Sequence, residues 1–151
     1  MGIFSNKKPF FSPDDNEKIV SAIRACEKRT SGEIRVFIES RNPLVDPLER
    51  AAEVFLGLKM ENTHHRNAVL LYIAYKDHEV ALYGDEGIHN AVGKEYWEQE
   101  VKHMLGYFRD NHLADGIMHC VLHVGDTLSE KFPYIAAEDK NELPDEIVFG
   151  H

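Results

Sequence analysis

The sequence predicts a single α/β domain in which helices cover both faces of a small sheet. The 151 residues suit one domain, and the 43% that are hydrophobic suffice for a sizeable core. Residues 68–74 are apolar throughout, which is typical of a strand buried on both faces. A helix-like stretch separates them from a strand-like run at residues 34–38. This strand–helix–strand order predicts that the two strands are parallel.

Local signals place the predicted helices. Ser12 and Pro13, followed by two acidic residues, begin a helix that extends to about residue 29. Asp46 and Pro47 begin a second helix, and two more are predicted at residues 94–109 and 114–131. The side chains expected to face inward from the second helix are Leu48, Ala52, Phe55 and Leu58. Those expected to face inward from the third are Trp97, Val101, Met104, Leu105 and Phe108.

The order of the strands follows from the connections. A tight turn at residues 76–77 leads from the central strand into a third strand at residues 79–83, which is therefore antiparallel to it. We expect a mixed sheet of three to four strands in the order 1-2-3, with a possible short edge strand at residues 146–149. The expected organisation is a flexible arm at residues 1–11, the domain at 12–133 and an acidic tail at 134–151.

Charge and hydropathy narrow the class of function. The net charge is −9, which argues against a general nucleic-acid or anionic-membrane binder, since such proteins need a basic surface. It is compatible with cation binding. No apolar run approaches the roughly 20 residues that span a bilayer, and the N-terminus has no signal-like apolar core. The sequence therefore predicts a cytoplasmic protein without a membrane span.

Three polar segments are predicted to meet at one edge of the sheet, where strands one and two begin and strand three ends. These segments are residues 30–33, 63–67 and 84–87. Calcium prefers carboxylate, hydroxyl and carbonyl oxygens, and this edge supplies them. The candidate metal ligands are Glu33, Asp85, Glu86, Asp115, Thr30 and Ser31. The alternative is that Asp85 and Glu86 only cap the following helix.

Arg66 belongs to the same edge. Near the beginning of a helix at Gly87, its guanidinium is a possible contact for a phosphate or another anion. The alternative is an ion pair with Glu33 or Asp85, and this is the interpretation we favour.

Four ordered motifs resemble the TPM domain family. They are residues 27–34 (EKRTSGEI), 50–55 (RAAEVF), 66–70 (RNAVL) and 83–88 (YGDEGI), and the resemblance covers roughly residues 12–133. It implies a three-layer α/β/α sandwich. It also implies divalent-metal binding, often of calcium, and the acid phosphatase activity claimed for plant thylakoid-lumen members.

Other catalytic signatures are incomplete. His119 and His123 are four residues apart, but the glutamate of the HExxH zinc motif is missing, so we expect both at the margin of the core. A cysteine phosphatase needs an arginine six positions after its thiol, and Asp126 stands there relative to Cys120. No catalytic residue is therefore predicted.

Three functions stay open. The first is a stand-alone domain that binds a divalent cation, calcium in our prediction, and acts as an accessory or interaction domain with an unknown protein partner. The second is a metal-assisted acid phosphatase, in which the metal polarises the phosphoryl group and acidifies water. The third is a metal-free structural interaction module.

Overall fold

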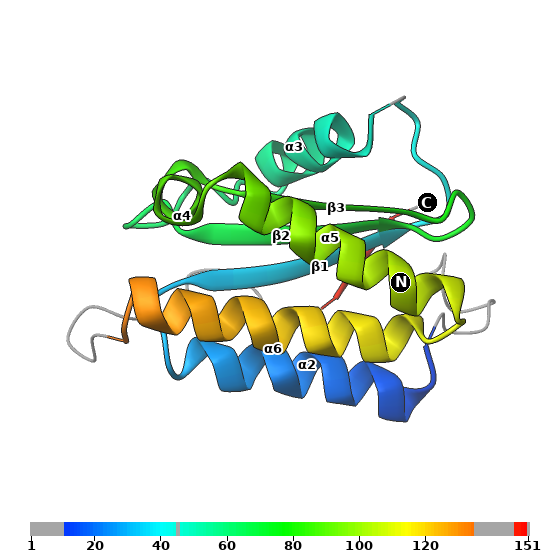
Figure 1. Ribbon diagram of the computed structural model, residues 1–151, viewed down its shortest axis with the longest axis horizontal. Helices are drawn as coiled ribbons and strands as arrows, with labels where there is room; N and C mark the ends of the chain where they lie inside the picture. Colours follow the sequence, from blue (N-terminus) through cyan, green and yellow to red (C-terminus); the bar gives the residue numbers. More distant parts are fainter. Residues whose placement is uncertain (1–10, 45, 135–146, 151) are drawn as a thin grey trace.

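A four-stranded mixed sheet lies between two layers of helices in the computed structural model (Figure 1). The structure describes residues 11–44, 46–134 and 147–150. The strand order is β3-β2-β1-β4. The strands are β1 (Glu33–Glu39), β2 (Ala68–Ala74), β3 (Glu79–Gly84) and β4 (Val148–Phe149). β1 is parallel to both β2 and β4, whereas β3 is antiparallel to β2, which confirms the predicted order and orientation of the first three strands.

The predicted edge strand is present as β4 beside β1, although it begins at Val148, and Glu146 is outside the described residues. Most of the predicted N-terminal arm and acidic tail also falls outside the described residues, so both stay predictions. Phe11, at the end of the predicted arm, is buried and lies edge-on against Phe149 with the ring centroids 6.5 Å apart. These contacts join the beginning of the described chain to the sheet edge at β4.

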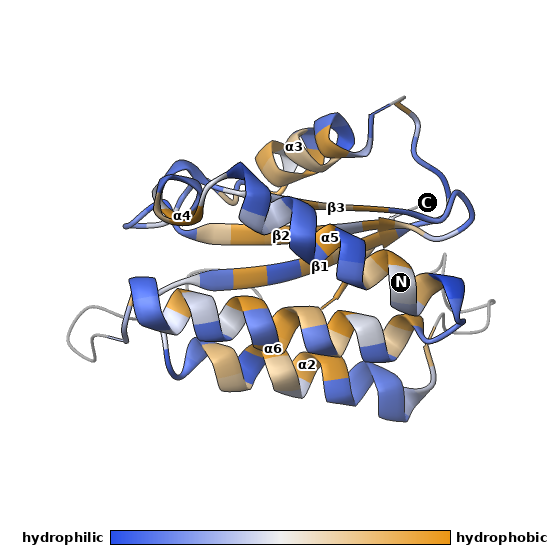
Figure 2. Cartoon of the chain, viewed as in Figure 1, coloured by the Kyte–Doolittle hydropathy of each residue, from blue (hydrophilic) through white to orange (hydrophobic). Residues whose placement is uncertain are grey.

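The helices divide unequally between the two faces of the sheet. One face is covered by α2 (Pro13–Glu27), α5 (Lys94–Arg109) and α6 (Leu113–Lys131), and the other by α3 (Pro47–Gly57). The short helix α4 (Glu86–Val92) follows β3. Leu70 and Leu71 are 0% and 1% exposed and belong to the hydrophobic clusters on opposite faces. Figure 2 shows the hydrophobic residues gathered along the strands and on the helix sides that face them. The predicted three-layer sandwich is therefore confirmed.

The helix caps follow the sequence signals. The Ser12 side chain accepts a hydrogen bond from the Asp15 backbone N–H at 3.1 Å, and Asp46 accepts one from Leu48 at 2.9 Å.

Two expectations about inward-facing leucines are wrong, because Leu48 is 50% exposed and Leu105 is 39% exposed. In α3 the buried face consists of Ala51, Val54 and Phe55. Its contact with the sheet is rotated relative to the stripe that we expected from Leu48 and Ala52.

None of the described helices is both long enough and apolar enough to cross a membrane.

Candidate functional site

The predicted edge brings two buried carboxylates to either side of the central strand. Glu33 is the register partner of Ala68 across β1 and β2. On the other side, the Asp85 backbone N–H donates to the Ala68 carbonyl at 2.9 Å. Glu33 is 3% exposed and Asp85 is 4% exposed. Residues separated by about 50 positions in the chain therefore meet at one end of the sheet, as the strand order predicted.

Arg66 neutralises one of these carboxylates. Its Nε and Nη2 donate to the two Asp85 oxygens at 2.6 and 2.8 Å, and its Nη1 lies 3.4 Å from the exposed carboxylate of Glu86. The hydrogen bonds to Asp85 raise the pKa of the Arg66 guanidinium, and attraction by Asp85, Glu86 and Glu61 adds to this. Of the two ion pairs that we favoured for Arg66, with Glu33 or with Asp85, the one with Asp85 is therefore present.

Asp85 also caps α4. Its Oδ1 accepts a hydrogen bond from the Glu86 backbone N–H at 2.8 Å, while Glu86 itself points outward with its side chain 66% exposed. The loop before β2 packs directly on this helix, and a side chain at Gly87 would place its Cβ 2.3 Å from the His65 carbonyl oxygen. The capping role that we considered for Asp85 is therefore observed. In this role the Asp85 carboxylate still lies at the same edge of the sheet as Glu33.

Thr30 and Ser31 have structural partners at this edge. The Thr30 hydroxyl lies 3.0 Å from the Leu128 carbonyl oxygen and also contacts the Phe132 carbonyl, both at the end of α6. The Ser31 hydroxyl accepts a hydrogen bond from the Asn67 side-chain amide at 3.2 Å. Thr30 therefore binds carbonyl groups at the end of α6, and Ser31 contacts the loop before β2.

Asp115 lies elsewhere. It is in the first turn of α6, 3.8 Å from the His112 ring, whereas the edge contacts Leu128 near the end of that helix. Thirteen residues of α-helix separate the two positions by about 20 Å. The structure therefore does not bring Asp115 together with Glu33 and Asp85.

The segment between α3 and β2 supplies oxygens that the sequence analysis did not identify as ligands. Oε2 of Glu61, Oγ1 of Thr63 and Oδ1 of Asn67 are buried and have no hydrogen-bond partner. Asn67 is 0% exposed and its backbone carbonyl lies 3.5 Å from the Glu33 nitrogen, so the segment borders the two carboxylates. The sequence shows a run of polar residues before the apolar strand. It does not show which of their side chains turn inward.

A cavity of about 440 Å³ adjoins the edge between β3, α4 and α5. Arg66 and Asp85 line it from one side, and Lys94, Trp97 and Glu98 from the other. As the side chains stand, no three His, Cys, Asp or Glu residues of the described chain are grouped closely enough to hold a metal ion. The edge therefore offers unpaired oxygens and buried carboxylates, with Arg66 as the present counter-charge of Asp85.

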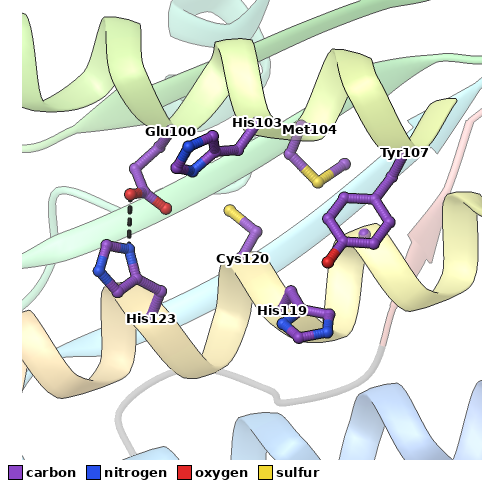
Figure 3. Close-up of a pocket in the computed structure, with 8 residues that line it drawn as sticks. Glu100, His103, Met104, Tyr107, His119, Cys120 and His123 are labelled. Atoms are coloured by element: carbon purple, nitrogen blue, oxygen red, sulfur yellow. Dashed lines mark hydrogen bonds and ion pairs between the residues drawn. The ribbon is translucent and has the colours of Figure 1, made fainter. Parts of the chain in front are cut away.

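A second cavity, of about 380 Å³, opens between α5 and α6 (Figure 3). Glu100, 4% exposed, lies with its Oε2 2.5 Å from His123 Nδ1. Cys120 lies on the cavity floor, and burial, together with the nearby Glu100 charge, raises the pKa of its thiol. The ring of His119 stacks on Tyr107 with centroids 5.2 Å apart. His119 and His123 are exposed at the rim of this cavity, whose floor is core.

The fold, together with the polar edge of the sheet described above, defines a small α/β/α domain of a known class. Residues 5–127 match the TPM domain family, and the chain belongs to this family. The resemblance seen in the four sequence motifs is thereby confirmed. No curated protein matches the chain.

Solved structures agree with this assignment. The NMR structure of the BA42 protein from the psychrophilic bacterium Bizionia argentinensis is 35% identical, has a TM-score of 0.86, and matches over 97% of this chain and 100% of that one. The N-terminal domain of the cg2496 protein from Corynebacterium glutamicum is 14% identical, with a TM-score of 0.63 over 79% of this chain and 74% of that one. The N-terminal domain of a protein from P. gingivalis is 17% identical, with a TM-score of 0.64 over 81% and 78%. The last two share the fold.

Proposed function

We propose that this TPM domain binds a divalent cation, calcium, at the strand edge and acts as an accessory or interaction domain for a protein partner. The observation that carries the proposal is the set of three buried, unpaired oxygens on Glu61, Thr63 and Asn67. An unsatisfied buried polar atom costs about 1–3 kcal/mol, so three within seven residues indicate a missing partner. All three are oxygens, and oxygen is the donor that calcium prefers.

The charges at the edge support a cation as that partner. Glu33 and Asp85 are buried, and Glu61 lies within electrostatic reach of Arg66. Carboxylates combined with neutral side-chain oxygens form the usual calcium ligand set. Glu33, Glu61 and Asp85, with Thr63 and Asn67, would hold the ion, while Glu86 stays at the rim. Asp85 would then exchange part of its bond to Arg66 for the cation. The TPM resemblance implies the same class of ligand.

Thermal unfolding of the metal-free protein with and without calcium tests the proposal. At a calcium concentration about 100 times the dissociation constant, binding to the folded state alone adds about 2.7 kcal/mol of stability. Glu61→Gln and Asp85→Asn should reduce this gain. Asp115→Asn is the matched control, since it removes an acidic residue at the far end of α6. If millimolar calcium leaves the unfolding of the wild-type protein unchanged, the cation site is refuted and the metal-free interaction module is favoured.

The metal-assisted phosphatase would use the same edge. Arg66 and Lys94 line the adjoining cavity and have the charge to attract a phosphate. However, Asp85 already accepts hydrogen bonds from Arg66 Nε and Nη2, and an all-oxygen calcium site is usually structural. We therefore place cation binding first.

A further inference from the structure

Side chains that can bind a ligand face each other across the groove between α5 and α6. On α5 its lining residues follow a helical stripe: Glu100, His103, Met104 and Tyr107. On α6 a matching stripe faces them: Gly116, His119, Cys120 and His123. A Cβ at Gly116 would lie 2.6 Å from the Tyr107 Cβ, so this glycine allows the two helices to approach closely. The groove therefore has a tightly packed end near Tyr107 and a polar end near Glu100.

Four donors of three chemical kinds lie at the polar end. Glu100 and Cys120 are buried on the floor at 4% and 5% exposure, and His103 and His123 are exposed above them. Figure 3 shows these side chains, two from each helix, pointing into the same space, while His119 lies apart beside Tyr107. One carboxylate, one thiol and two imidazoles are all donors that a tetrahedral zinc-type ion accepts.

We propose that this end of the groove is a site for a borderline transition-metal ion such as Zn²⁺, bound by Glu100, His103, Cys120 and His123. Nitrogen and sulfur donors distinguish it from the oxygen-rich strand edge, so it does not depend on the cation proposed there.

Binding an ion requires these side chains to rearrange. A tetrahedral ion with bonds of about 2.0–2.1 Å to nitrogen and oxygen holds these two atoms about 3.3 Å apart. The Glu100 Oε2–His123 Nδ1 contact of 2.5 Å must therefore open by less than about 1 Å. Within the described chain no three such donors are yet grouped to hold an ion. His103 and His123 are exposed and can rotate toward the floor, because exposed side chains change rotamer freely.

Binding must also remove a proton. The buried Cys120 thiol coordinates only as thiolate, so the incoming ion releases its proton to solvent. Affinity should therefore rise with pH.

Cobalt is the probe, because Co²⁺ substitutes for Zn²⁺ and absorbs visible light. Titration of the metal-free chain should give the visible bands of tetrahedral cobalt and a near-ultraviolet thiolate-to-cobalt band, both lost on adding zinc. Cys120→Ser and Cys120→Ala should abolish the near-ultraviolet band. His103→Ala should weaken binding by about tenfold or more, as the loss of a ligand predicts.

Matched controls keep this test decisive. Cys26→Ser removes the other buried cysteine, and His119→Ala removes a histidine from the same groove; both should leave cobalt affinity unchanged. Asp85→Asn should also leave it unchanged, which separates this site from the strand edge. Far-ultraviolet circular dichroism confirms folding of each variant. The proposal is overturned if the wild type shows no thiolate band, if the band survives both Cys120 variants, or if His119→Ala weakens binding as much as His103→Ala.

Discussion

Arg50 holds a buried carboxylate on the face of the sheet that α3 covers. Its Nε and Nη2 donate to the two Glu39 oxygens at 2.8 and 2.9 Å, and the Tyr72 hydroxyl donates to Glu39 Oε2 at 2.5 Å. The side chains of Glu39 and Arg50 are 5% and 19% exposed. Burial and, to a smaller extent, the hydrogen bond to Glu39 raise the pKa of Tyr72, so the phenol stays protonated and remains a donor. The three side chains form one network that joins β1, β2 and α3.

Arg50→Met keeps the aliphatic length but removes the cation. Glu39 is then left buried with Tyr72 as its remaining partner in the network. Removing one member of a buried ion pair costs about 3–5 kcal/mol, because the other charge is stranded away from water. We therefore expect Arg50→Met to lower the free energy of unfolding by about 3–5 kcal/mol.

Urea unfolding monitored by circular dichroism measures this loss. Arg41→Met is the matched control, since the Arg41–Asp77 pair has a similar N–O distance of 2.8 Å but Arg41 is 67% exposed. Exposed pairs contribute about 0–1 kcal/mol. Equal losses in the two variants would refute the argument that burial, and not pairing as such, determines the cost.

The remaining predictions concern the core, pH and catalysis. Leu71→Ala should cost about 2–5 kcal/mol in urea unfolding, and Leu122→Ala, at a 40% exposed site, much less; equal costs would contradict the central position of β2. Burial raises the pKa of Tyr96 to about 12, so the folded state retains a proton that the unfolded state loses, and stability should fall between about pH 10 and 12. Tyr96→Phe should lessen that fall, and an unchanged pH profile would refute this assignment. Purified protein should show little or no phosphomonoester hydrolysis with calcium, magnesium or manganese; robust turnover lost in both Asp85→Asn and Arg66→Ala would reverse this view.

Local chemistry explains why the architecture was predictable. The continuous apolar run of β2 can be buried only between two layers, and the turn after it determines that β3 is antiparallel. Ser12 and Asp46 cap their helices as expected because a cap depends on neighbouring residues alone. The convergence of Glu33 and Asp85 followed from strand order without any further information.

Distances across helices and the direction of loop side chains were less predictable. Asp115 is among the candidate ligands expected at the edge, but the length of α6 places it about 20 Å away. Leu48 matched an apolar stripe, but the rotation of α3 on the sheet leaves it half exposed. The exposure of Leu48 comes from the placement of α3 on the sheet, which depends on how complete surfaces pack together.

By itself, the sequence determined the strand order, the helix caps, the TPM resemblance and the polar edge, because each depends on residues close together in the chain or on short connections. The sequence favoured an ion pair of Arg66 with Glu33 or Asp85, and only the tertiary structure identified Asp85 as a partner. The tertiary structure alone decided that Arg50 meets Glu39 and Tyr72, and that Glu100 faces His123. Each of these contacts joins different elements, and its geometry depends on packing angles that no local pattern specifies. Burial then gives these contacts their energy, because a charge or hydrogen bond removed from water must find its partner inside the protein.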